Sequence, residues 1–251
     1  MTSKQTHSSL AAMTEIPEDQ RVKLRPPPHV LNVQFGTIWN IATPFVYRYE
    51  DRRWIDEFFE TGKLRLSTFS KFAEYKDEAR GDTEEGSGFC YGETADGKSV
   101  GVFQSQGISA AVLCCSHRLD EGLRQAFSRE WAFEITNTVG FALEVSRQLP
   151  GFRHGLEGSC LYRSDTGIKR AIDFDYEKYK LPDGSIDMQM IFDAGGALGG
   201  PELLLMKRKK YESQQEYRLL WELDVANGDY IDVTAPNARQ HCRKVLDSDW
   251  S

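Results

Sequence analysis

Three short segments carry the side chains best suited to bind an anionic ligand. Residues 47–49 read Tyr-Arg-Tyr, residues 80–86 combine one arginine with three acids and two glycines, and residues 216–218 read Glu-Tyr-Arg. Arginine binds carboxylates and phosphates through a planar fork of N–H donors, and such charge-assisted bonds are strong. The first and last segments lie on strand-like runs, which a sheet can bring together. They therefore predict a site for a polyanionic or nucleotide-like ligand.

Each of these charged groups could instead have a purely structural role, without a ligand. Arg48 stands between two tyrosines on an expected strand, so it faces either a ligand cleft or plain solvent. Glu216 and Arg218 alternate with Tyr217 and share one face of a strand, where they could form an ion pair without any ligand. An Arg48–Glu216 pair across adjacent strands fits both interpretations, so the sequence leaves them open.

The loop at 80–86 offers further candidate ligands. Arg80 is a candidate anion ligand, and carboxylates such as Asp82 and Glu85 either bind Mg²⁺ through one or two oxygens or form a solvated acidic surface. The five histidines have no metal-ligand spacing to one another or to a cysteine, apart from the adjacent pair His241-Cys242, so no zinc site is predicted. The chain lacks a glycine-rich phosphate loop that ends in Lys-Ser or Lys-Thr.

Length and composition limit the class of protein. A chain of 251 residues with 40% hydrophobic residues can build one packed domain, expected at 29–251 after a disordered or extended tail at 1–28. The net charge of −7 argues against general wrapping of nucleic acid. Five cysteines without a C-x-x-C pair indicate a reducing, cytoplasmic compartment. No apolar run is long enough for a membrane span.

Hydrophobic periodicity predicts an α+β fold with a mixed, mainly antiparallel sheet and packed helices. A strand at 44–49, a helix from Asp51 to Gly62 and a strand at 64–69 form the first unit. Residues 186–192 fit either a helix or a strand. The remaining expected elements are helices at 119–133, 173–179 and 238–246 and strands at 100–104, 108–116, 139–145, 158–163, 203–207, 216–223 and 230–233.

The order of these elements resembles a bacterial family known mainly as a domain of unknown function. The resemblance covers residues 44–224 and rests on an aromatic–basic–aromatic strand, a helix that ends in glycine and a late Glu-Tyr-Arg strand. The matching positions are 47–49, Gly62, Phe72, 115–116, Trp131, 140–143 and 211–218. Residues 74–77 depart from the Asn-Asp that usually follows the phenylalanine loop.

A weaker resemblance connects the first unit with ADP-ribosyltransferase folds. It rests on a polar first strand, Ser67-Thr68 on the second strand and Gln214-Gln215-Glu216 near the end, although the histidine common on the first strand is absent. The resemblance implies NAD as cofactor, with Arg48 on the pyrophosphate, Glu216 on the ribose and Ser67 as a further catalytic group. Tyr47, Tyr49, Thr68, Arg80 and Arg218 would then contact the cofactor.

Three functions follow from these observations. The ADP-ribosyltransferase resemblance implies transfer of ADP-ribose to a macromolecule, or hydrolysis of NAD, in a bacterial or phage-defence setting. The alternatives are a non-catalytic sensor of a nucleotide or another anion, and a metal-dependent nuclease that uses Asp82, Glu85 and Glu216. The expected partners are a small nucleotide and a macromolecular target. The identity of that target, the trigger and the oligomeric state stay open.

Overall fold

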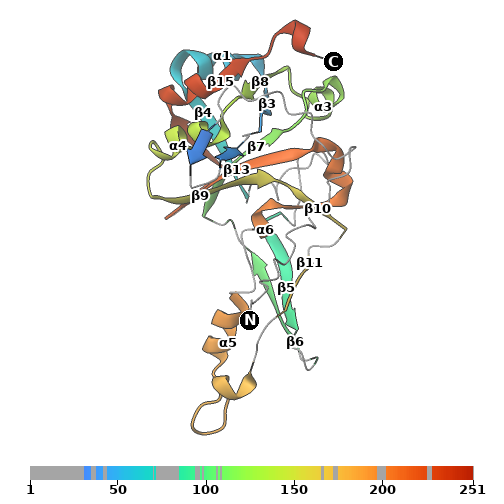
Figure 1. Cartoon of the computed structure of the whole chain (residues 1–251), viewed down its shortest axis with the longest axis vertical. Helices are drawn as coiled ribbons and strands as arrows, with labels where there is room; N and C mark the ends of the chain where they lie inside the picture. The colour runs from blue at the N-terminus through green and yellow to red at the C-terminus, as the bar shows by residue number, and fades with distance from the viewer. Residues whose placement is uncertain are drawn as a thin grey trace, which may run out of the picture.

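The computed structural model describes residues 31–34, 38–41, 44–69, 71, 85–93, 97, 99–105, 107, 109–164, 167–171, 175–196, 202–224 and 228–250. The predicted α+β class is confirmed, because helices pack on a mainly antiparallel sheet of eight strands. The tail expected at 1–28 and Arg80 lie outside the described residues. Figure 1 shows a broad body around the large sheet and a narrower extension below it.

The first unit folds as the sequence predicts. Strand β3 (Val46–Glu50) leads into helix α1 (Arg52–Thr61), which buries Ile55 and Phe58 and is followed by strand β4 (Lys63–Thr68). Gly62 ends the helix with φ at 82°, and its N–H donates to the Phe58 carbonyl at 2.7 Å. A Cβ at Gly62 would lie 2.4 Å from Pro236 Cα, so both the dihedral angle and the packing require glycine there.

Strand β7 (Ala110–Ser116) is the centre of the large sheet. Strand β13 (Glu216–Leu223) pairs with it antiparallel along residues 110–116, and strand β9 (Phe152–Ser159) extends the sheet beyond β13. These three strands lie across the middle of the molecule (Figure 1). Because β13 occupies one whole edge of β7, every other strand must pair with the opposite edge.

The opposite edge of β7 is shared by two strands, so the sheet forks. Strand β4 pairs through Ser67↔Val112 and Thr68↔Ala111, whereas β3 pairs through Tyr47↔Ser116. Strand β14 (Tyr230–Thr234) continues the first branch, and strands β8 (Trp131–Ile135) and β15 (Cys242–Lys244) continue the second. Helix α1 connects the two branches and packs its Phe58 ring on Phe133 of β8, with centroids 5.1 Å apart.

The extension is built on a separate sheet of three strands. Strand β5 (Ser87–Glu93) pairs antiparallel with β6 (Ser99–Ser105) and parallel with β11 (Gly167–Ala171). Helix α5 (Met188–Gly196) lies beside it in Figure 1. The remaining elements are β1 (Leu31–Gln34), β2 (Ile38–Ile41), β10 (Leu161–Arg163), β12 (Met206–Arg208), helix α6 (Glu202–Leu205) and 3-10 helices η2 (Tyr176–Tyr179), η3 (Lys209–Gln214), η4 (Pro236–His241) and η5 (Asp247–Asp249).

Three elements differ from the sequence prediction. The helix expected at 119–133 is a short helix α3 (Glu121–Ala126) followed by β8, because the chain turns at Ser128, whose φ is 52°. The strand expected at 139–145 is helix α4 (Thr138–Ser146), which begins with an Asn137 side chain that accepts the Gly140 N–H. The terminal helix expected at 238–246 is η4 followed by β15.

Two shorter elements in the C-terminal half of the chain also differ from the sequence prediction. The strand expected at 203–207 begins as helix α6 and becomes strand β12 from Met206. The helix expected at 173–179 is the 3-10 helix η2. Of residues 186–192, whose sequence fits either a helix or a strand, residues 188–192 lie in helix α5, and Ile186 forms an isolated bridge with Lys180. Among the described residues, no helix has the length and apolar character needed to cross a membrane.

Candidate functional site

The fork in the sheet exposes a short stretch of β7 between its two partner strands. Val112 and Ser116 pair with β4 and β3, so the backbone of Cys114, which has the same alternation, points into the gap between them. The Cys114 carbonyl accepts a hydrogen bond of 2.9 Å from Arg48 Nη1. The Arg48 guanidinium therefore occupies the place that a neighbouring strand would fill, and the Cys114 carbonyl holds it there.

A pocket opens at this fork, and we call it the fork pocket. It has a volume of about 290 Å³. Its walls come from α1, from both branches of the sheet and from β7, so elements far apart in sequence contribute to one cavity. The lining residues are Arg48, Glu50, Arg53, Trp54, Glu57, Phe58, Lys63, Leu64, Arg65, Ser67, Leu113, Arg129, Phe133, Tyr230 and Asp232.

One carboxylate connects two guanidinium groups in the fork pocket. Glu50 Oε2 lies 2.8 Å from Arg48 Nη2, and Glu50 Oε1 lies 2.8 Å from Arg129 Nη1. Arg129 also contacts Asp51 Oδ2 at 3.1 Å. Burial is the largest single influence on the pKa of Arg48 and lowers it, but the charge and hydrogen bond of Glu50, together with the nearby thiols of Cys115 and Cys114, raise the pKa above its ordinary value. Arg48 therefore stays charged beside Glu50.

The rim of the fork pocket combines charges with aromatic rings. Arg65 makes a two-pronged contact with Asp232, at 2.6 and 2.9 Å, and its guanidinium lies 5.1 Å from the centroid of Tyr230. Arg53 lies 4.6 Å from the Trp54 ring and has no carboxylate partner among the described residues. Five cations and three carboxylates line the pocket, so it is locally positive in a chain of net charge −7.

The structure does not bring Glu216 to Arg48. Tyr47 and Glu216 pair with Ser116 from opposite edges of β7, so β7 lies between β3 and β13 rather than the two strands lying side by side. Tyr47, Ser116 and Glu216 share one face of the sheet by this register, and Arg48, the next residue, points to the other face. The expected Arg48–Glu216 pair is therefore wrong.

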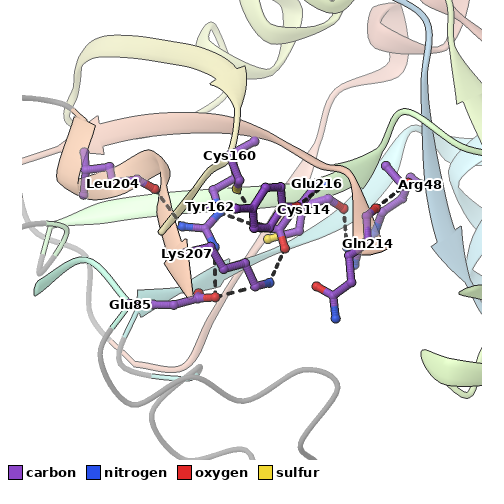
Figure 2. A network of polar contacts seen from close by, with 11 residues as sticks. Arg48, Glu85, Cys114, Cys160, Tyr162, Leu204, Lys207, Gln214 and Glu216 are labelled. Atoms are coloured by element: carbon purple, nitrogen blue, oxygen red, sulfur yellow. Dashed lines mark hydrogen bonds and ion pairs between the residues drawn. The ribbon is translucent and has the colours of Figure 1, made fainter. Parts of the chain in front are cut away.

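Glu216 belongs instead to a sealed group of charges, which we call the buried charge cluster: Glu85, Lys207, Glu216 and Arg218. Glu216 pairs with Lys207 and, at 2.5 Å, with Arg218 Nε, while Glu85 lies 2.9 Å from Arg218 and 3.3 Å from Lys207. Figure 2 shows the Glu216 carboxylate directed at Lys207, with Arg48 set apart beside the Cys114 carbonyl. The four side chains are at most 7% exposed.

The surroundings complete the bonding of the buried charge cluster. Arg218 Nη1 donates to the Leu204 carbonyl at 2.7 Å, and the Glu216 N–H donates to the Tyr162 hydroxyl at 2.6 Å. Burial alone would raise the pKa of Glu216, but Arg218 and Lys207 outweigh it and hold that pKa well below its ordinary value. Two acids and two bases balance one another, which is typical of a structural ion-pair network.

The other residues expected in the site lie in different parts of the structure. Ser67 lines the fork pocket with Arg48. Tyr47 and Tyr49 are buried in an apolar cluster with Leu123, and the Tyr49 hydroxyl donates to the Arg118 carbonyl at 2.8 Å. Burial raises the pKa of Tyr49.

Thr68 and the proposed nuclease acids also lie away from the pocket. Thr68 is buried, and its hydroxyl donates to the Gly228 carbonyl at 3.0 Å. Glu85 and Glu216 neutralise bases in the buried charge cluster, and Asp82 lies outside the described residues. The part of the chain that the structure describes contains no group of three or more His, Cys, Asp or Glu arranged to hold a metal ion.

Sequence reasoning missed the partners of Arg48. Glu50 follows the Tyr-Arg-Tyr segment directly, and its alternation with Arg48 was a usable signal that both share a face. Arg129 was hidden within the helix expected at 119–133, so its position beside Glu50 depended on the turn at Ser128. Trp54 and Tyr230 were visible as aromatic residues but not as walls of one cavity.

Comparison of this chain with protein-family models, with curated proteins and with solved structures gives no match.

Proposed function

We propose that this chain binds a phosphate-bearing nucleotide in the fork pocket. One observation carries the proposal: Arg48, Arg129 and Ser67 line the same cavity as Trp54 and Tyr230. Guanidinium groups bind phosphate oxygens, and aromatic side chains stack on bases, a contact worth about 1–3 kcal/mol per base. The pocket thus offers partners for both chemical halves of a nucleotide.

Size and charge narrow the proposed ligand. The cavity volume of about 290 Å³ is close to the lower limit of small-molecule sites, so it suits a mononucleotide or one half of a dinucleotide. The excess of cations over carboxylates favours an anion over a neutral nucleoside. ADP, ADP-ribose and NAD are therefore the ligands to test first.

Use of NAD as a substrate is a second candidate function. It is favoured by the presence of Arg48 and Ser67 in one pocket, because the ADP-ribosyltransferase resemblance assigns roles to both. Cleavage of the nicotinamide–ribose bond develops positive charge on the ribose, which a nearby carboxylate stabilises. Glu216 is too enclosed for that task, so a carboxylate of the pocket itself would have to serve.

Calorimetric titration of ADP, ADP-ribose and NAD tests the binding proposal. Arg48→Gln should weaken binding by about 10- to 100-fold, because hydrogen bonds to charged groups contribute about 1.5–3 kcal/mol. Arg153→Gln is the matched control, since Arg153 pairs with Asp224 on the exposed surface of β9 and should leave affinity unchanged. Equal affinities for all three proteins, or no binding of any nucleotide to the wild type, would contradict the proposal.

The same wild-type and variant proteins also show whether NAD is only bound or is consumed. Free nicotinamide, measured by chromatography after incubation with NAD, should appear with the wild type and decrease with Arg48→Gln if the chain consumes NAD. Nucleotide binding without nicotinamide release would leave the sensor as the function and reject the NAD-consuming enzyme.

A further inference from the structure

We propose that the phosphoryl group of the ligand binds between Arg48 and Arg129, at the position that the Glu50 carboxylate occupies. Glu50 is then an internal stand-in for the ligand, and its side chain moves aside when a phosphoryl group arrives. This inference rests on the proposed nucleotide site and specifies its anion-binding position.

The geometry around Glu50 is that of an anion held by two guanidinium groups. Its two oxygens each lie 2.8 Å from a different arginine, one on Arg48 and one on Arg129. A phosphoryl group presents oxygens in a similar span and carries more charge than a carboxylate. The side chains of Arg48, Glu50 and Arg129 are 19%, 17% and 22% exposed, so an incoming group can reach all three.

Both arginines keep a second anchor that does not depend on Glu50. Arg48 Nη1 donates to the Cys114 carbonyl at 2.9 Å, and Arg129 Nη1 contacts Asp51 Oδ2 at 3.1 Å. Removal of the Glu50 carboxylate therefore leaves two guanidinium groups facing one gap, already oriented. Such preorganisation lowers the cost of binding a ligand anion.

The movement required of Glu50 is small. Glu50 is the last residue of β3, and its backbone stays paired with Trp131 of β8. The side chain gives up its two arginine contacts and the weaker 3.2 Å bond that Glu50 Oε1 accepts from the Asp51 N–H. Rotation of one side chain at the mouth of the pocket is sufficient, with no change in the sheet.

Because the ligand must displace the Glu50 carboxylate, the site should favour ligands that carry more charge than a carboxylate. A single carboxylate offers no more charge than Glu50 and lacks the advantage of being tethered to the site, so it should not compete. A phosphomonoester or pyrophosphate carries additional charge, which Arg53 at the rim can meet because it has no carboxylate partner among the described residues. The ligand should therefore be recognised by a terminal or bridging phosphate.

Variants of Glu50 test this inference directly, with inorganic pyrophosphate as the calorimetric probe. Glu50→Gln and Glu50→Ala should tighten pyrophosphate binding by at least 10-fold, since both remove the competing carboxylate. Asp56→Asn is the matched control: it removes one unit of negative charge from the neighbouring helix α1, but Asp56 is 58% exposed, pairs with Lys244 and does not line the pocket, so the affinity should change by less than threefold. Sodium acetate should not compete with pyrophosphate in any of these proteins.

Two results would overturn the inference. Pyrophosphate affinity that is unchanged or weaker in both Glu50 variants would mean that Glu50 does not occupy the anion position. Equal gains in affinity for Asp56→Asn and the Glu50 variants would mean that the effect comes from net charge and not from an emptied anion position. If Glu50→Ala does not fold, Glu50→Gln, which preserves side-chain volume, decides alone. If the Glu50 variants give either of these results but the wild type still binds ADP-ribose and Arg48→Gln weakens that binding, only the Glu50 inference is rejected. The proposed nucleotide site is then retained.

Discussion

The fork pocket and the buried charge cluster are built from the same kinds of residue but differ in access. In the cluster, the side chains of Arg218 and Glu216 are 0% and 7% exposed, and each is enclosed by oppositely charged partners. In the pocket, Arg48 and Glu50 are 19% and 17% exposed and border a cavity. Arginine and carboxylate types alone therefore do not identify a site, whereas access to a cavity separates a binding pair from a structural one.

The position of the cluster explains its structural role. Glu85 precedes strand β5 of the small sheet, Lys207 lies on β12, and Glu216 and Arg218 lie on β13 of the large sheet. Their ion pairs thus connect the extension to the body of the molecule, as Figure 2 shows for Glu85, Lys207 and Glu216. In the fork pocket, by contrast, the charges border a gap that no strand fills.

The largest expected effect is on stability and concerns Arg218. Arg218→Met keeps much of the side-chain volume but leaves Glu85 and Glu216 with only Lys207 as a basic partner in the cluster. Removal of one member of a buried ion pair costs about 3–5 kcal/mol. We expect a loss of this size in the free energy of unfolding, measured by urea denaturation.

Arg153→Met is the control for the Arg218 prediction. Arg153 also pairs with an acid, Asp224, but both side chains are more than half exposed. Exposed pairs contribute little to stability, so the urea midpoint should not change measurably. Similar midpoints for Arg218→Met and Arg153→Met would remove the distinction between the cluster and the surface pairs.

The acid dependence of stability gives the next largest effect. The pKa of Glu216 is lower in the folded protein than in the unfolded chain, because Arg218 and Lys207 outweigh burial. Its contribution to stability is therefore complete above the unfolded pKa, about 4.3, and is lost as the pH falls toward the folded value. Glu216→Gln should be less stable than the wild type at pH 7, and the difference should narrow below about pH 4.

Urea denaturation of the wild type and Glu216→Gln from pH 7 to pH 3 checks this expectation. Other carboxylates titrate in the same range, but they are common to both proteins and cancel in the difference. A difference in unfolding free energy that stays constant over the whole range would mean that the charge on Glu216 is not what stabilises the cluster.

Local sequence patterns predicted the strand–helix–strand unit well. The helix from Asp51 to Gly62 has apolar residues on one face and a glycine at its end, and these signals act over a few residues. The apolar run at 139–145 fits a buried strand by its apolar character alone, but it forms a helix. Two signals in the sequence favour the helix: Phe141 and Val145 are four residues apart, as on one helix face, and Asn137 provides the N-cap.

The candidate site could be predicted only in part, because it depends on strand order. The sequence correctly placed Arg48 and Ser67 on consecutive strands, and both line the fork pocket. It could not show that β13 takes one edge of β7 while β3 and β4 divide the other. That arrangement depends on long-range pairing, and it is what separates Glu216 from Arg48.

The smallest expected effect separates two neighbouring residues of β4. Ser67 lines the fork pocket, whereas the hydroxyl of buried Thr68 donates to the Gly228 carbonyl at 3.0 Å. Ser67→Ala should weaken nucleotide binding by about two- to tenfold without changing stability, and Thr68→Val should cost about 1 kcal/mol of stability without changing affinity, because each removes one neutral hydrogen bond. Calorimetric titration and urea denaturation of both variants provide the comparison. If both variants affect the same property, the boundary between pocket and structural core does not lie between these two residues.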